Sequence, residues 1–157
     1  MRIFIAILAS LFIIPVMAQR EKLPELNQQV LKYVDQQIGK KVGRGECWDL
    51  AQEALDGISA KWDGNLKFGR LINPKREAIL PGDIIQFEKV RVKFQDGNFE
   101  ITENYQHHTA IVYEVEGKTQ LQIAQQNTSY SGKKVAVSPL DLKNIDRGKI
   151  FIYRPTK

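Results

Sequence analysis

The 157-residue sequence is poor in two of the residues that most often carry chemistry: it has one cysteine, Cys47, and two histidines, His107 and His108. A single thiol excludes an internal disulfide, so the fold must be stabilised by its core. The adjacent histidines point to opposite faces of a strand, and no carboxylate stands at a suitable spacing nearby, which argues against a zinc site. We expect neither a metal nor a cofactor.

The chain also lacks a strong charge imbalance. Lys and Arg number 23 against 18 Asp and Glu, a net charge of +5, and the basic residues are scattered along the sequence. This pattern does not indicate a nucleic-acid-binding protein. The sequence contains no internal repeat and no low-complexity segment, and its length suits one domain with its own core. We expect a monomer.

Long hydrophobic runs are absent except at the N-terminus. Residues 3–16 are almost unbroken apolar residues after a basic start, and Val16-Met17-Ala18 supplies the residues that a signal peptidase recognises. The run is shorter than the roughly 20 residues that span a bilayer. We therefore predict a signal peptide over residues 1–18 and a secreted or periplasmic domain over residues 19–157, with no membrane span after cleavage; an uncleaved anchor is the alternative.

The order of periodic segments predicts an α+β fold, with N-terminal helices packed on a small antiparallel sheet. Helical spacing marks residues 24–40 and 46–58. After the turn at Pro81-Gly82-Asp83 the period changes to 2, which is typical of strands. The expected strands are 84–87, 90–94, 99–102, 108–115, 121–125, 134–137 and 150–153, with a β-hairpin over 90–102 and a helical turn at 139–142.

Cys47 stands where the Gly-rich loop Gly43-Arg44-Gly45 leads into the second predicted helix. Unpaired N–H groups and the positive end of the dipole at a helix start favour the thiolate form. The two glycines would let the backbone approach a substrate closely. The N–H of Cys47 would point toward a developing oxyanion. This setting predicts a nucleophile, and the alternative is a cysteine that fills a gap in the core.

A cysteine nucleophile requires a base, and the base requires a partner that orients its ring. The histidine pair lies at the start of a predicted strand, so only one of the two can face Cys47. Pairing outward from the turn at Glu116-Gly117 brings Gln125 or Asn127 within side-chain reach of His108. Otherwise one histidine is simply packed and the other exposed, and the amides lie at a polar strand end.

Four ordered blocks together resemble the CHAP and NlpC/P60 superfamily of papain-like cysteine peptidases: Gly45-Glu46-Cys47-Trp48, Pro81 to Phe87, His108 to Val112, and Gln125-Gln126-Asn127. The resemblance implies a papain-like fold and hydrolysis of amide bonds, which in most members belong to bacterial cell-wall peptides. It implies Cys47 as the nucleophile and His108 as the general base.

The third catalytic residue departs from that superfamily. Gln125 stands where CHAP members often have glutamate, and Asn127 matches an asparagine two positions further on. We prefer Asn127 as the orienting residue and take Gln125 as the second choice. His107 stands where glycine is usual.

The sequence therefore predicts an exported cysteine hydrolase that acts on peptidoglycan or another peptide substrate. Because the third residue is not acidic, a papain-like fold kept as a cell-wall or protein binding module without turnover is the main alternative. A secreted protease or transferase that acts on proteins is a further one.

Overall fold

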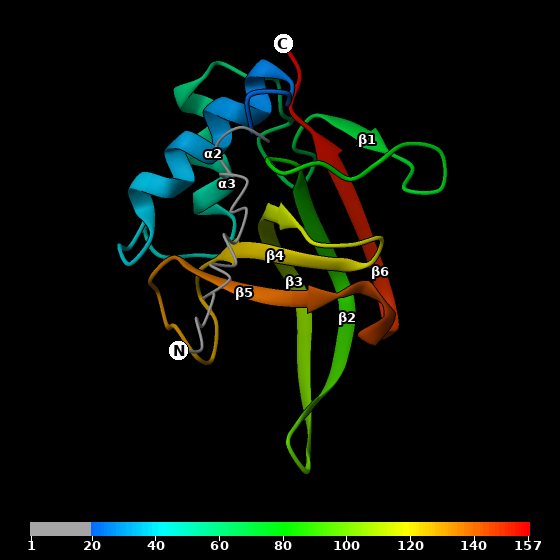
Figure 1. The fold of residues 1–157 in the computed structure, drawn as a ribbon. Coiled ribbons are helices and arrows are strands. Elements are labelled where there is room, and N and C mark those ends of the chain that lie inside the picture. The colour runs from blue at the N-terminus through cyan, green and yellow to red at the C-terminus, as the bar shows by residue number, and fades with distance from the viewer. Residues whose placement is uncertain (1–19) are drawn as a thin grey trace, which may run out of the picture.

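The computed structural model describes residues 20–157, and the predicted signal peptide over residues 1–18 lies outside this range. Within it, two helices precede a six-stranded sheet (Figure 1), and the α+β class is confirmed. The helices are α2 (Glu25–Gln37), α3 (Asp49–Gly57) and the short 3-10 helix η1 (Leu142–Asn144); the strands are β1 (Arg70–Ile72), β2 (Ile84–Asp96), β3 (Phe99–Val115), β4 (Gln120–Gln125), β5 (Ala136–Asp141) and β6 (Ile145–Arg154).

The sheet has the strand order β1-β6-β2-β3-β4-β5, and every neighbouring pair is antiparallel. Strands β2 and β3 pair from Ile84↔Ile111 outward and form a ribbon that extends beyond the rest of the sheet (Figure 1). In the same view β4 and β5 run across the direction of β2 and β6, so the sheet curls strongly. Pro139 is tolerated in β5 because this strand lies at an edge of the sheet.

Several elements differ from the sequence prediction. Residues 90–102 are not a separate hairpin but the outer part of two long strands, and the strand that carries His108 begins at Phe99. The intervening residues 103–107 lack a regular apolar alternation, and they form a strand because they pair with residues 88–92 of β2. The helical turn predicted at 139–142 is divided between β5 and η1. β1 is too short for a periodic signal.

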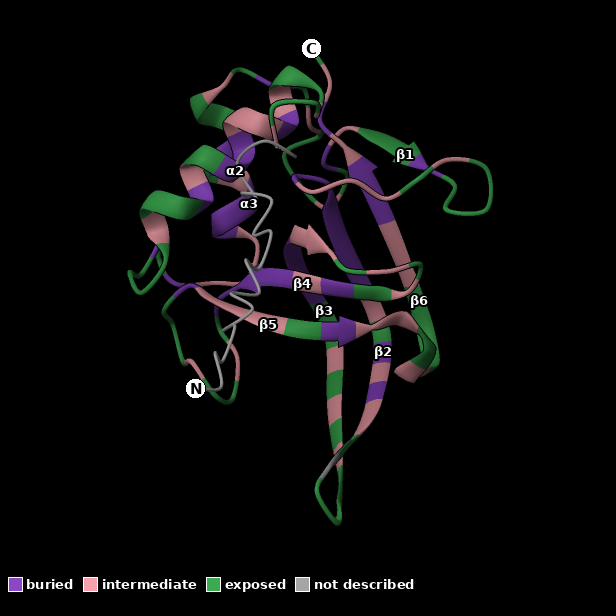
Figure 2. Cartoon of the chain, viewed as in Figure 1, coloured by how far each residue is buried: buried purple, intermediate pink, exposed green. Residues whose placement is uncertain are grey.

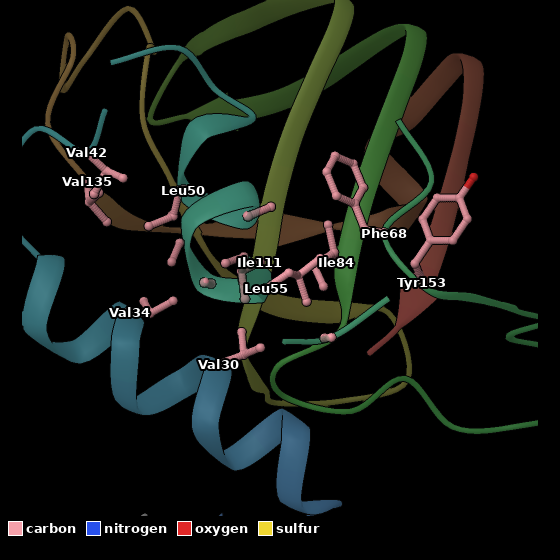
Figure 3. Close-up of a cluster of buried hydrophobic side chains, with 14 residues drawn as sticks. Val30, Val34, Val42, Leu50, Leu55, Phe68, Ile84, Ile111, Val135 and Tyr153 are labelled. Atoms are coloured by element: carbon pink, nitrogen blue, oxygen red, sulfur yellow. The ribbon is translucent and has the colours of Figure 1, made fainter. Parts of the chain in front are cut away.

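The two faces of the sheet bury different cores. On one face, Leu50 and Leu55 of α3 and Val30 and Val34 of α2 pack around Ile111 (Figure 3). Each such side chain contributes about 1.5–3 kcal/mol when it leaves water. On the other face the curled sheet packs against itself, with these residues among the buried ones: Ile85, Phe87, Val112, Ile123 and Ile152. Figure 2 shows this burial along the inner part of the sheet, while the end of the ribbon is exposed.

No helix in residues 20–157 has the length and apolar character needed to cross a bilayer.

Candidate active site

Cys47 lies in a tight turn just before α3, and its side chain is half-buried. The helix was expected to begin at Glu46, but it begins at Asp49, after Trp48 at the N-cap position. The turn is closed by the N–H of Gly45, which donates to the carbonyl of Val42 at 2.9 Å. The thiol therefore stands beside the helix start rather than within its first turn.

A buried aspartate gives this turn its shape. The Oδ2 atom of Asp49 accepts hydrogen bonds from the backbone N–H of Arg44 at 2.8 Å and of Glu46 at 3.1 Å. Its Oδ1 atom lies 3.3 Å from the guanidinium of Arg44. The carboxylate also lies at the positive end of α3, where a negative charge is stabilised. Asp49 thus ties the loop on the N-terminal side of Cys47 to the helix that follows.

The two loop glycines are explained by this shape and not by an open approach for a substrate. Gly43 and Gly45 have φ values of +54° and +83°, in the left-handed region that favours glycine. A Cβ at Gly43 would lie 2.9 Å from Asp49 Oδ2, and one at Gly45 would lie 2.8 Å from side-chain carbons of Lys133. Both positions face protein atoms, so the expected role in substrate approach is wrong.

The residues that follow β4 hold the Cys47 loop from the other side. Gln126 is fully buried; its Oε1 accepts from the N–H of Val42 at 3.1 Å, and its Nε2 donates to the carbonyls of Val42 at 3.0 Å and Glu46 at 2.7 Å. Lys133 pairs with the Glu46 carboxylate at 3.0 Å. Sequence analysis missed this role for Gln126, because a single buried amide bonded to a distant loop has no periodic signature.

His108 is buried on β3, and its Nε2 lies 2.6 Å from Oε1 of Gln125. The Nε2 of Gln125 donates to the hydroxyl of Ser138 at 2.9 Å, which turns the amide oxygen toward the ring. The imidazole stacks on the ring of Tyr105, with ring centroids 4.6 Å apart. The ring of Phe87 also lies against the imidazole, with centroids 5.7 Å apart. With Nε2–H donating to the amide oxygen, the neutral ring carries its basic lone pair on Nδ1.

The second histidine is exposed, as the alternation along a strand predicts. His107 Nδ1 lies 2.6 Å from a carboxylate oxygen of Glu88 at the surface. Among residues 20–157, no three or more His, Cys, Asp or Glu side chains are grouped so that they could hold a metal ion.

The preference for Asn127 as the partner of His108 does not agree with the structure, which places Gln125 on the ring. Asn127 has a φ of +61° and lies past the end of β4. This left-handed conformation directs its side chain to the Cys47 loop, where its amide donates to Glu46 Oε2 at 3.1 Å. Gln125 is still within β4 and is buried, so its side chain reaches the imidazole.

The Cys47 sulfur lies at the peptide group that joins His108 to Thr109. The N–H of Thr109 donates to this sulfur, at a point of β3 beyond its last paired residue with β4, Ile111. Burial raises the pKa of the Cys47 thiol, and the hydrogen bond from Thr109 opposes that rise. Burial also lowers the pKa of His108, against the hydrogen bond with Gln125. Both shifts favour a neutral thiol and a neutral imidazole before substrate binds.

Comparisons with known proteins agree with this fold. The family model described as the AIM3/BBC1 cysteine proteinase-fold domain matches residues 21–157. Altered inheritance of mitochondria protein 3 of Debaryomyces hansenii is 28% identical over 146 residues, which covers 82% of this chain. This chain spans only 16% of that protein's length.

Two crystal structures of Ly7917 share the fold. The first is 18% identical with a TM-score of 0.52, and the match covers 81% of this chain and 62% of the Ly7917 chain. The second, with the hydrolyzing product of MDP, is 21% identical with a TM-score of 0.53, and the match covers 82% of this chain and 63% of the Ly7917 chain. The resemblance to CHAP and NlpC/P60 proteins thus holds for the papain-like fold, and the chain belongs to the AIM3/BBC1 cysteine proteinase-fold domain family.

Proposed function

We propose that this domain is a cysteine hydrolase that cleaves an amide bond. Cys47 is the nucleophile, His108 is the general base, and Gln125 holds the imidazole in one tautomer. The observation that carries the proposal is the buried hydrogen bond between His108 Nε2 and Gln125 Oε1, with the Cys47 sulfur at the next peptide group. A buried imidazole held this way leaves Nδ1 as its proton acceptor.

The chemistry proceeds in two stages. Nδ1 of His108 takes the thiol proton as the sulfur attacks the carbonyl carbon, and the imidazolium then gives that proton to the departing amine. The acyl group remains on Cys47 as a thioester. A water molecule, deprotonated by the same nitrogen, releases it as a carboxylic acid. Because the resting pair is neutral, proton transfer accompanies attack instead of preceding it.

The substrate we propose is a short peptide, with peptidoglycan peptides as the first class to test. Support comes from the blocks shared with CHAP and NlpC/P60 proteins, and from Ly7917, whose structure was solved with the hydrolyzing product of MDP. Action on a cell wall further requires export, which rests on the predicted signal peptide at residues 1–18. The curated relative is a yeast protein, which makes peptides from other proteins the second class.

Alkylation tests the nucleophile directly, because Cys47 is the only thiol in the chain. We expect iodoacetamide to add one carbamidomethyl group to the folded protein, as measured by intact mass. The rate should fall in His108→Ala and remain unchanged in the matched variant His107→Ala. Hydrolysis of MDP or of a stem-peptide panel should disappear in Cys47→Ala. A folded protein whose Cys47 resists alkylation would exclude the mechanism.

A binding module without turnover is the second candidate. Two observations favour it: the orienting residue is a neutral amide, and burial shifts the pKa values of both Cys47 and His108 away from an ion pair. For such a module, Cys47→Ser would retain peptide binding, and the unmodified protein would show no hydrolysis. Hydrolysis that disappears in Cys47→Ala excludes this candidate.

A further inference from the structure

A cavity of about 620 Å³ opens between the β2–β3 ribbon and β5. Its size falls in the range of about 300–1,000 Å³ that is typical of small-molecule sites. Most of its wall is apolar. The ribbon contributes Val92, Phe94 and Ile101, and the opposite wall comes from Val137, Pro139 and Leu140.

The cavity reaches the surroundings of the candidate base. Phe87, Tyr105 and Gln125 all line it, and all three contact the ring of His108. Because these side chains fix the imidazole, a ligand in the cavity would touch the residues that hold His108 in place.

The charged residues in the cavity wall are both acidic, although the whole chain is basic. They are Glu103 and Asp141, and no Lys or Arg lies among the lining residues in the described part of the chain. The Asp141 carboxylate accepts a hydrogen bond from the backbone N–H of Lys143 at 3.0 Å. This hydrogen bond makes the largest contribution to lowering the pKa of Asp141 below its usual value. Glu103 accepts from the hydroxyl of Tyr105. A positive ligand is therefore favoured here and a negative one disfavoured.

We propose that this cavity binds an apolar group that carries a cationic end, such as an aliphatic amine or a hydrophobic residue next to a positive charge in a peptide. The apolar walls take the body of the ligand, and the two carboxylates select the sign of its charge. The site does not depend on hydrolysis by Cys47, and it can be tested in a protein that lacks the thiol.

The test uses N-phenyl-1-naphthylamine, a neutral dye that fluoresces in apolar sites, with the Cys47→Ser protein. We expect the dye to bind and decylamine to displace it at a concentration at least about tenfold below that of decanoate, a difference near 1.4 kcal/mol. Ile101→Trp fills the cavity and should abolish dye binding. Thr102→Trp, whose position is exposed on the same strand and does not line the cavity, is the matched control.

The charge preference has its own variants. Glu103→Gln combined with Asp141→Asn should reduce the preference for decylamine to less than about threefold, a difference below about 0.7 kcal/mol. Glu100→Gln, an exposed carboxylate on the same ribbon, should leave it unchanged. These conservative variants decide the matter even if Ile101→Trp does not fold.

Equal displacement by the amine and the acid overturns the proposal, as does dye binding that survives in a folded Ile101→Trp protein. Displacement by a Leu-Lys peptide as well as by decylamine would assign the site to a peptide, and displacement by decylamine alone would assign it to a free small molecule. Because the dye is measured without the thiol, a failure of the hydrolase proposal leaves this result standing.

Discussion

The loop that carries Cys47 and the strand that carries His108 are held by different kinds of contact. Several backbone groups of the loop are bonded to two buried side chains, Asp49 and Gln126. The imidazole is held by aromatic packing and a single amide, that of Gln125. The two regions meet at the end of β4, where the consecutive residues Gln125 and Gln126 reach one region each. The position of the Cys47 loop is thus fixed by several hydrogen bonds, whereas the orientation of the His108 ring depends on a single hydrogen bond.

The largest effect is expected from Gln126→Leu, which keeps the volume but removes three hydrogen bonds to Val42 and Glu46. The N–H of Val42 is then left without a partner, which costs about 1–3 kcal/mol. The carbonyls of Val42 and Glu46 each lose one hydrogen bond but keep those from the N–H groups of Gly45 and Asp49, so we expect the free energy of unfolding to fall by about 2–5 kcal/mol in all. Urea unfolding measures this. Gln122→Leu, also on β4 but bonded to Glu116 at the surface, should change it by less than about 1 kcal/mol. A loss below about 1 kcal/mol for Gln126→Leu would contradict the conclusion that these hydrogen bonds hold the Cys47 loop.

The sequence located the candidate nucleophile and base because each stands in a distinctive local setting. A Gly-rich turn precedes Cys47 and a helix follows it, and an apolar strand follows His108. The choice between Gln125 and Asn127 could not be made this way. It depends on where β4 ends and on the left-handed conformation of Asn127, which brings its side chain to Glu46, far away in the sequence.

The expectation that the Cys47 thiolate is favoured was wrong for a similar reason. The sequence places Cys47 at a helix start, which argues for a lowered pKa. In the structure α3 begins at Asp49 and the thiol is packed against Thr109 of β3, so burial becomes the larger effect and raises the pKa. Burial by a distant strand is a tertiary property that no local pattern reports. The sequence predicted the hairpin over 90–102 but not its continuity with the strand of His108, because residues 103–107 lack the regular apolar alternation that marks a strand.

The next effect concerns the single contact of the base. Gln125→Leu leaves the Nε2–H of buried His108 and the hydroxyl of Ser138 without a partner, and we expect a loss of about 1–3 kcal/mol of stability together with slower alkylation of Cys47. Gln125→Glu sharpens the comparison, because a carboxylate at this position raises the pKa of His108 and should speed alkylation at neutral pH. Unchanged alkylation in both variants would show that Gln125 does not orient the base.

The pH dependence of stability tests the burial of His108. Its native pKa lies below the ordinary value, which is about 6.5 in the unfolded chain. Between the two values the unfolded chain binds a proton that the native protein does not, so acidification favours unfolding. The free energy of unfolding should therefore fall as the pH drops below about 6.5, by at most about 1.4 kcal/mol per pH unit.

Urea unfolding at about pH 7.5 and 5.5 measures this slope, with His107→Gln as the background because only two histidines are present. Adding His108→Gln should remove the slope in that range. A slope that persists without either histidine would have to come from other groups, and the burial of His108 would then be unsupported.

The smallest effect is expected at Asn127. Asn127→Gly suits the φ of +61° and removes only an exposed hydrogen bond to Glu46, so stability should change by less than about 0.5 kcal/mol. Alkylation of Cys47 should keep its rate, because His108 retains Gln125. The contrast with Gln125→Leu is the point of the measurement, since the two amides lie two residues apart. A tenfold slower alkylation in Asn127→Gly would mean that Asn127 turns onto the imidazole during the reaction, and the base would then share the contacts that hold the loop.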